Sequence, residues 1–371
     1  MVRTAHRLIV VGLLGSACAD APAPGIPEWS LSEAPLLWIG TEGGPETEFH
    51  RVAGAVRLGD GEIAVADAGS NEVRYFGPDG TYRRSFGRLG SGPGEFRSMG
   101  RPIRFGDTLA VYDSRSTRLT LFRRDTLLET RVVRAPNAVS RFSMTDRLAD
   151  GRWLGSTGVS PRFSSHPYRD SIALGIFPAS GDGDMRLLGW FPGPWIVSIE
   201  GQRAGLGGFF RWVHARVVGQ QIVVLDADQE RLRRLSPDGS ESPAGVLLNL
   251  GPPLTPELVA EARRRDVVPR EDPVSQQGWL DARYDPAVLP AHPPFRSLLV
   301  DSENLIWLEQ YRVDETQPGS YVVLTPDARP VASLTVPAGF RATDIGPSYI
   351  LGIRTDADGV ENIVMYRLSR T

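Results

Sequence analysis

The chain has 371 residues and a formal net charge of −3, so it is long enough for a large core and lacks the strongly basic balance of nucleic-acid-binding proteins. All 41 basic residues are arginine, a bias that genomic base composition explains; arginine would indicate anion capture only where it clusters at one site. The 40 glycines and 30 prolines, with no long amphipathic helical stretch, favour an all-β protein with many turns.

The first 18 residues have the organisation of an export signal. Two arginines precede an apolar run, 8–14, that is too short to span a bilayer, and small residues then lead to Cys18, the only cysteine in the chain. The segment resembles a bacterial lipoprotein signal, which implies a lipid on Cys18 and anchoring to a membrane. The alternative is an ordinary secretory signal cut after Ala19 or Ala21, which gives a soluble exported protein.

The residues after Cys18 suggest a location and a tether. Ala19 directly follows the cysteine, which by resemblance to Gram-negative lipoproteins implies the outer membrane, facing the periplasm. Residues 19–33 are rich in Pro and Ala and are expected to form a tether. Residues 34–371 are expected to form one domain.

A short signature recurs along that domain with a base period of about 46 residues. It consists of Phe followed by Arg or His, just before an apolar strand. The copies are Phe49-His50, Phe96-Arg97, Phe210-Arg211, Phe295-Arg296 and Phe340-Arg341, with a reversed copy at Arg141-Phe142.

A second pattern recurs between these signatures: an alternating strand, an acidic residue, a polar turn, another alternating strand and a Gly-containing turn. It predicts a β-propeller of six four-stranded antiparallel blades. The segment 34–40 has no unit of its own, and we expect it to pair in the last blade and close the ring. The copies of the pattern are 59–80, 106–125, 218–239, 302–328 and 346–369, with a blurred copy over 148–193.

The stretch 65–96, VADAGSNEVRYFGPDGTYRRSFGRLGSGPGEF, resembles the NHL-type repeat of six-bladed propellers. The chain is similar to bacterial six-bladed propeller lipoproteins of unassigned function. This resemblance implies the fold but no activity, because propellers host unrelated functions.

The glycine-rich segment 86–96 lacks the lysine and the following helix of a phosphate-binding loop. We therefore interpret it as the joint between the first two blades, with Phe96 filling the core between them.

The Phe-Arg and Phe-His positions are expected near one mouth of the central channel, on the same face as the turns that follow Asp67, Asp113 and Asp226. The basic side chains either pair with acids of neighbouring blades and staple the ring, or form a polar funnel for an anionic group. The candidate ligand-binding residues are His50, Arg97, Asp113, Arg211, His214, Asp226, Arg296 and Arg341.

Metal sites have weaker support. The histidines lack the H-x-H or H-x-x-x-H spacing typical of zinc ligands. Calcium bound through Asp67, Asn71 or Asp113 is conceivable, although Asp and Asn at turns usually cap the local backbone. We predict no cofactor, with Ca²⁺ as the one candidate.

Two insertions interrupt the repeats, at 156–170 and 251–293, and both are expected on the channel-mouth face as a lid or as surface decoration. The second contains one predicted helix, 255–266, with Thr255 as its N-cap and Pro256 at its first position.

The sequence therefore predicts a lipid-anchored, monomeric binding or scaffold module for an envelope protein, a glycan or a small anionic ligand, with no nucleic-acid partner. The alternative function is a metal-dependent lyase or lactone hydrolase with its site in the channel. A G-x-S-x-G nucleophile motif is absent from the sequence.

Overall fold

The structure is a computed structural model. The residues that it describes are 25–40, 44–124, 126–133, 142–159, 161–162, 164–181, 183–198, 204–209, 212–226, 231–247, 255–266, 273–285 and 295–371.

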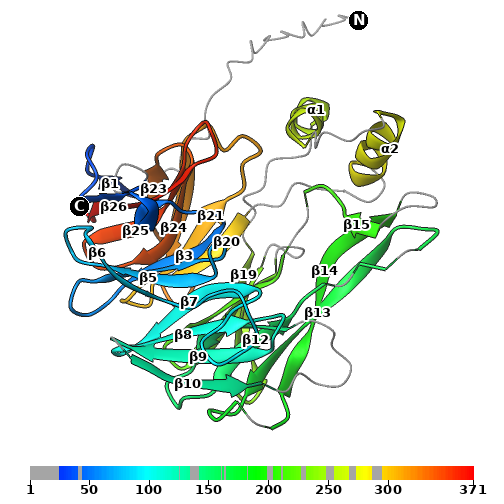
Figure 1. The fold of residues 1–371 in the computed structure, drawn as a ribbon. Coiled ribbons are helices and arrows are strands. Elements are labelled where there is room, and N and C mark those ends of the chain that lie inside the picture. Colours follow the sequence, from blue (N-terminus) through cyan, green and yellow to red (C-terminus); the bar gives the residue numbers. More distant parts are fainter. Residues whose placement is uncertain are drawn as a thin grey trace, which may run out of the picture.

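Strand pairing resolves six antiparallel units that follow one another around a ring (Figure 1). In units 1 to 5 the strands pair in chain order, starting from the inner strand, as alternating apolar patterns and tight turns predict. The first three units are unit 1 with β3 (Val52–Arg57), β4 (Ile63–Asp67), β5 (Glu72–Phe76) and β6 (Tyr82–Phe86); unit 2 with β7 (Met99–Phe105), β8 (Thr108–Asp113), β9 (Arg118–Arg123) and β10 (Thr126–Val132); and unit 3 with β11 (Phe142–Arg147), β12 (Trp153–Thr157), β13 (Tyr168–Phe177), β14 (Arg186–Ser198) and β15 (Ala204–Leu206).

The second half of the chain forms three more units. Unit 6 completes its four strands with a segment from near the start of the chain. These units are unit 4 with β16 (His214–Val218), β17 (Gln221–Asp226), β18 (Arg231–Leu235) and β19 (Glu241–Leu247); unit 5 with β20 (Phe295–Val300), β21 (Ile306–Gln310), β22 (Gly319–Leu324) and β23 (Pro330–Val336); and unit 6 with β24 (Phe340–Ile345), β25 (Tyr349–Thr355), β26 (Glu361–Ser369) and β2 (Leu37–Ile39).

The ring is closed as predicted, because β2 pairs antiparallel with β26, with Leu37 opposite Met365. The expected tether, 19–33, needs a correction: Glu28–Leu31 within it form strand β1. The first half of β1 pairs in parallel with β23, and its second half pairs antiparallel with β26. This short strand therefore spans the seam between units 5 and 6.

Six hydrophobic clusters lie one at each junction between neighbouring units, including the junction between units 6 and 1. Phe residues at or beside the recurring signature fill five of these junctions, whereas Phe209 packs in a seventh cluster with residues of the second insertion, and each is at most 7% exposed. Phe96, at the end of the glycine-rich joint, lies between units 1 and 2 as predicted. The all-β propeller prediction is confirmed, but the prediction of four strands in every unit is wrong for unit 3, which has five because β15 pairs with the long strand β14. The buried signature-region phenylalanines are Phe49, Phe96, Phe142, Phe209, Phe295 and Phe340.

The inner strands share a local irregularity near their starts. Five of the six described inner strands, all except β16, have a register shift against the second strand of their unit. In β7 the shift lies between Met99 and Pro102, and in β11 between Met144 and Asp146. A bulge bends a strand and re-aims the side chains that follow it. The residues facing the channel are therefore set by these bulges as well as by the two-residue alternation of a strand.

Two helices lie outside the strands of the ring (Figure 1): α1 (Pro256–Arg265) and α2 (Pro273–Arg283). The predicted helix is α1, and the side chain of Thr255 accepts the backbone N–H of Leu258 at 3.2 Å as its N-cap. Sequence analysis missed α2. Among the described residues, no helix has the length and apolar character that crossing a membrane requires.

Candidate functional site

The first strands of all six units line a central channel. We call the end where these strands begin the upper face; the turns between second and third strands lie there too, because neighbouring strands are antiparallel. The channel has an upper compartment of about 160 Å³ and a lower compartment of about 200 Å³. The residues that line both compartments are Val56, Arg101, Pro102, Arg216, Leu299 and Thr343.

Arg101 and Arg216 lie where the two compartments meet. Arg101 donates to the carbonyl of Thr145 at 2.9 Å, and Arg216 donates to the carbonyl of Ala215 at 2.8 Å. The buried Nε atoms of both have no hydrogen-bond partner, and neither side chain forms an ion pair, among the residues that the structure describes. Burial lowers the pKa of both, and the charge of Arg101 helps to lower that of Arg216 to about 9.

Two carboxylates lie near this pair, but backbone groups occupy them. Asp146 accepts the backbone N–H of Val217 with one oxygen and that of Arg147 with the other, both at 2.9 Å. Asp344 accepts a backbone N–H, the hydroxyl of Tyr349 at 2.8 Å and the guanidinium of Arg104 at 3.3 Å. The charges of Asp146 and Asp344 raise the pKa of Arg101, although neither carboxylate forms an ion pair with it.

His214 begins β16 and lines the upper compartment. Burial, followed by the charge of Arg216, lowers its pKa from 6.5 to about 4, while the backbone carbonyl of Arg296 opposes the shift. His214 is therefore a neutral imidazole at neutral pH.

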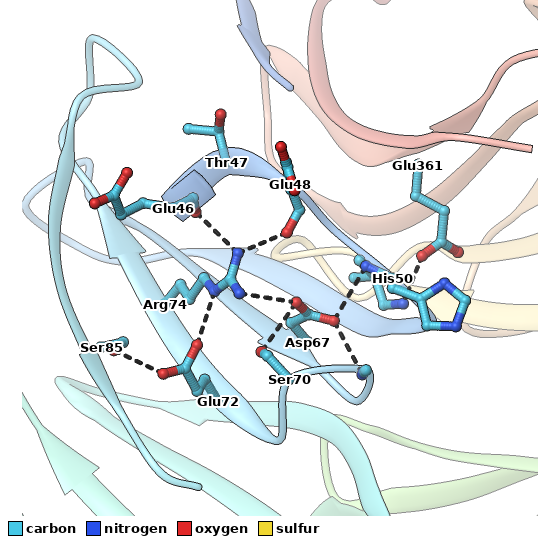
Figure 2. A network of polar contacts seen from close by, with 12 residues as sticks. Glu46, Thr47, Glu48, His50, Asp67, Ser70, Glu72, Arg74, Ser85 and Glu361 are labelled. Carbon is cyan, nitrogen blue, oxygen red and sulfur yellow. Dashed lines mark hydrogen bonds and ion pairs between the residues drawn. The ribbon is translucent and has the colours of Figure 1, made fainter. Parts of the chain in front are cut away.

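The acids of the upper-face turns accept hydrogen bonds within their own units, as Figure 2 shows for Asp67. Asp67 accepts the backbone N–H groups of His50 and Gly69, the hydroxyl of Ser70 and the guanidinium of Arg74. In the next unit Asp113 accepts the backbone N–H groups of Arg97, Arg115 and Ser116. Each acid thus ties its own turn to the segment entering the same unit. Cross-unit stapling by these acids was one of the two predicted arrangements, and the described contacts of Asp67 and Asp113 do not form it.

The candidate ligand-binding residues do not form one cluster. His214 and Arg341 line the upper compartment. His50 and Arg97 are exposed, and Asp113 is fully buried in its turn. Arg296 donates to Glu315 at 2.7 Å. Arg211 and Cys18 lie outside the described residues, as does the side chain of Asp226, which ends β17.

Sequence analysis missed the arginines at the centre of the channel, Arg101 and Arg216, together with Arg104. Arg101 lies four positions after the signature arginine Arg97, so the signature marks the correct strand but the wrong residue. Arg101 itself lies within the bulge between Met99 and Pro102.

The calcium hypothesis gains no support from the side chains. Among the described residues, no group of three or more His, Cys, Asp or Glu side chains is arranged to hold a metal ion. The oxygens of Asp67 and Asp113, two of the proposed ligands, already accept N–H and O–H donors. The third, Asn71, has a positive φ of 62°, which fits a turn residue.

The helices of the second insertion pack beside the channel mouth. Ala262 of α1 and Leu280 of α2 share a cluster with Val197 of β14 and with Tyr311 and Val313 beyond β21. Arg265 of α1 also forms an ion pair with Asp314 at 2.7 Å. The insertion therefore bridges units 3 and 5, and these contacts do not involve the channel-lining residues.

Antiparallel units packed in a closed ring around a channel define a β-propeller. No protein-family model and no curated protein matches the sequence. The structure is similar to that of a protein from Bacteroides fragilis NCTC 9343 that is described as exported, with a TM-score of 0.52, 12% identity and coverage of 95% of this chain and 98% of that one.

Two further solved structures have comparable similarity. A member of the DUF4221 family from Bacteroides vulgatus ATCC 8482 has a TM-score of 0.50 and 10% identity, with coverage of 93% of this chain and 99% of that one. Regucalcin, a calcium-binding protein from Agrobacterium tumefaciens C58, has a TM-score of 0.48 and 10% identity, with coverage of 92% and 96%. These neighbours are β-propeller-like proteins, and the likeness concerns the fold alone.

Proposed function

We propose that the protein is a binding module that holds a small anionic ligand in the central channel, at Arg101 and Arg216. The observation that carries this proposal is the juxtaposition of two guanidinium groups beside a cavity, each with a buried Nε atom that lacks a partner among the described residues. Buried charges are normally paired, and an arginine fork binds carboxylate or phosphate oxygens in a bidentate manner.

Electrostatics supports the same assignment. Burial lowers the pKa of both arginines, the charge of Arg101 further lowers that of Arg216, and the charge of Asp146 opposes both shifts. An anion placed between them would supply charge-assisted hydrogen bonds and relieve their mutual repulsion. The binding energy would thus come from groups that are already fixed by the inner strands, so little ordering is required.

The proposal includes the cellular setting indicated by the sequence. The module is exported by its N-terminal signal, anchored by a lipid on Cys18 to the outer membrane facing the periplasm, and monomeric, with NHL-like repeats forming the ring. The signal-like segment 1–18 and the repeat pattern support this part. A metal-dependent lyase or lactone hydrolase was the alternative, and the contacts of the described residues favour the binding module.

Isothermal titration calorimetry of the purified protein with butyrate and with inorganic phosphate tests the proposal. We expect millimolar or tighter binding of at least one of the two anions. Arg216→Gln and Arg101→Gln should each weaken binding by roughly 10- to 100-fold, since a hydrogen bond to a charged group contributes about 1.5–3 kcal/mol.

Arg123→Gln is the matched control, because Arg123 is exposed on β9 and forms only a 3.4 Å ion pair with Asp107. It should bind anions like the wild type. Equal affinity in all three variants, or no binding of either anion by the wild type, would overturn the proposal.

A further inference from the structure

The two compartments of the channel differ in charge. Three carboxylates, those of Asp146, Asp301 and Asp344, belong to residues that line the lower compartment, together with Arg104, which pairs with Asp344. Among the described residues, no carboxylate residue lines the upper compartment, where Arg341 joins Arg101 and Arg216. The arginine charges are therefore offset by carboxylates on the lower side and not on the upper side, so an anion is attracted more strongly to the upper side of the arginine pair.

The nearest buried acid on the upper side is screened from the cavity. Glu309, on β21, is 0% exposed and accepts the hydroxyl of Ser297 at 2.9 Å. Ser297 lines the compartment, and Glu309 lies behind it. The charge of Glu309 also faces Arg296, whose pKa is lowered by burial but raised overall by Glu309 and Glu315.

The rest of the upper compartment is formed by small apolar groups. Its polar groups other than the arginines are few: the neutral imidazole of His214 and the hydroxyls of Ser297 and Thr343. A ligand rich in hydroxyls would leave most of its hydrogen bonds unmade against such walls. The apolar lining residues are Ala53, Gly54, Ala55, Val56, Pro102, Leu299 and Ala342.

We propose that the ligand of this site is a small amphipathic monocarboxylate, with its carboxylate on Arg101 and Arg216 and its short apolar chain in the upper compartment. This inference rests on the proposed anion-binding function and deepens it by naming the ligand class. It also assigns the arginine pair to the floor of the upper compartment, below His214 and Arg341.

Titration calorimetry with a series of carboxylates tests the chemical class. Affinity should rise from acetate to butyrate to hexanoate, by about threefold to fourfold for each methylene that is buried. Inorganic phosphate and tartrate should bind at least 10-fold more weakly than butyrate. Phosphate or tartrate binding as tightly as butyrate would overturn the monocarboxylate assignment and leave anion binding intact, whereas no binding of any anion would overturn both.

A pair of cavity-filling variants tests the placement. Ala53→Leu adds bulk to the upper compartment, and Val300→Leu is the control, because Val300 lines only the lower one. Ala53→Leu should weaken hexanoate binding at least 10-fold while acetate binding changes less, and Val300→Leu should leave both within about threefold. Thermal unfolding of both variants verifies that they fold. Loss of hexanoate binding in Val300→Leu, with Ala53→Leu unaffected, would place the chain in the lower compartment and overturn the assignment.

Discussion

Arg74 in the upper-face network of unit 1 is buried and Arg216 in the channel is partly exposed, and their partners differ as well. Arg74 is 8% exposed and contacts Asp67 at 3.4 Å, Glu72 at 3.1 Å and the carbonyls of Glu46 and Glu48 at 3.0 and 2.7 Å (Figure 2). Arg216 donates one hydrogen bond, to a backbone carbonyl.

The difference separates a structural arginine from a functional candidate. A buried cation surrounded by acceptors contributes to the stability of the unit that contains it, because its desolvation is offset by several contacts. A guanidinium beside a cavity, with N–H donors that have no acceptor, can bind an anionic ligand from solution. Every basic residue of this chain is arginine, so the residue type does not show whether a given arginine is structural or functional. The groups that contact its guanidinium do.

The largest effect is expected for Arg74→Met. This substitution leaves Asp67 buried without its ion-pair partner and two carbonyls without a donor, so it should lower the free energy of unfolding by about 3–5 kcal/mol. Chemical denaturation with urea measures the change. Anion binding should be unaffected in the fraction that remains folded.

The control for Arg74 is Arg83→Met on β6. Arg83 has a side chain that is 51% exposed and contacts Asp79 only at 3.9 Å. Its substitution should change the free energy of unfolding by less than about 0.5 kcal/mol. If both variants lost similar stability, the upper-face network would not have the structural role assigned to it.

A smaller, pH-dependent effect is expected for His214→Gln. In the folded protein the pKa of His214 is about 4, below its ordinary value of 6.5, so the unfolded chain binds more protons between these pH values. Acidification from pH 6.5 to 4 should therefore cost the wild type about 2–3 kcal/mol more stability than the variant. Urea denaturation across this pH range measures the difference; parallel curves for the two proteins would contradict it, and His50→Gln, at an exposed position, is the control.

The smallest effect on stability is expected for Arg216→Met. Because burial and the charge of Arg101 both disfavour the charge of Arg216, and Asp146 offsets them without a direct ion pair, removing the charge of Arg216 should leave the free energy of unfolding unchanged or raise it by up to about 1 kcal/mol. The same variant should lose anion binding. A loss of several kcal/mol would place Arg216 in the same class as Arg74.

Much of the fold could be predicted from the sequence because each repeat contains residues that determine its own strands and turns. Strand alternation, glycine-containing turns and the Phe signature recur in each unit, and the lone apolar segment containing Leu37 and Ile39 indicates the closing strand. Strand β1 was missed because its sequence, EWSL, alternates over only four residues and follows a Pro-rich segment. Its pairing depends on edges that exist only in the assembled ring.

The site was harder to predict. Arg97 and Arg101 both belong to the entry into unit 2, and the sequence alone does not show which one faces the channel. Arg101 lies in the bulge between Met99 and Pro102, where the register of β7 against β8 shifts, and a bulge changes the direction in which a side chain points. Arg216 and Arg101 come from units 4 and 2, so their juxtaposition is a property of the ring and has no counterpart in any short motif.

The seam formed by β1 and β2 has a consequence for the order of folding. Ser32 accepts the backbone N–H of Arg367 across 335 positions, and Glu361 accepts that of Val52 across 309 positions. Contacts between residues so far apart in the sequence have a large entropic cost of loop closure. We therefore expect them to form late in folding. Units 1 to 5 can pair their own strands locally, but unit 6 and the closed wall of the channel are completed only when the two ends of the ring meet. The proposed anion binding would therefore report directly on the last step of folding.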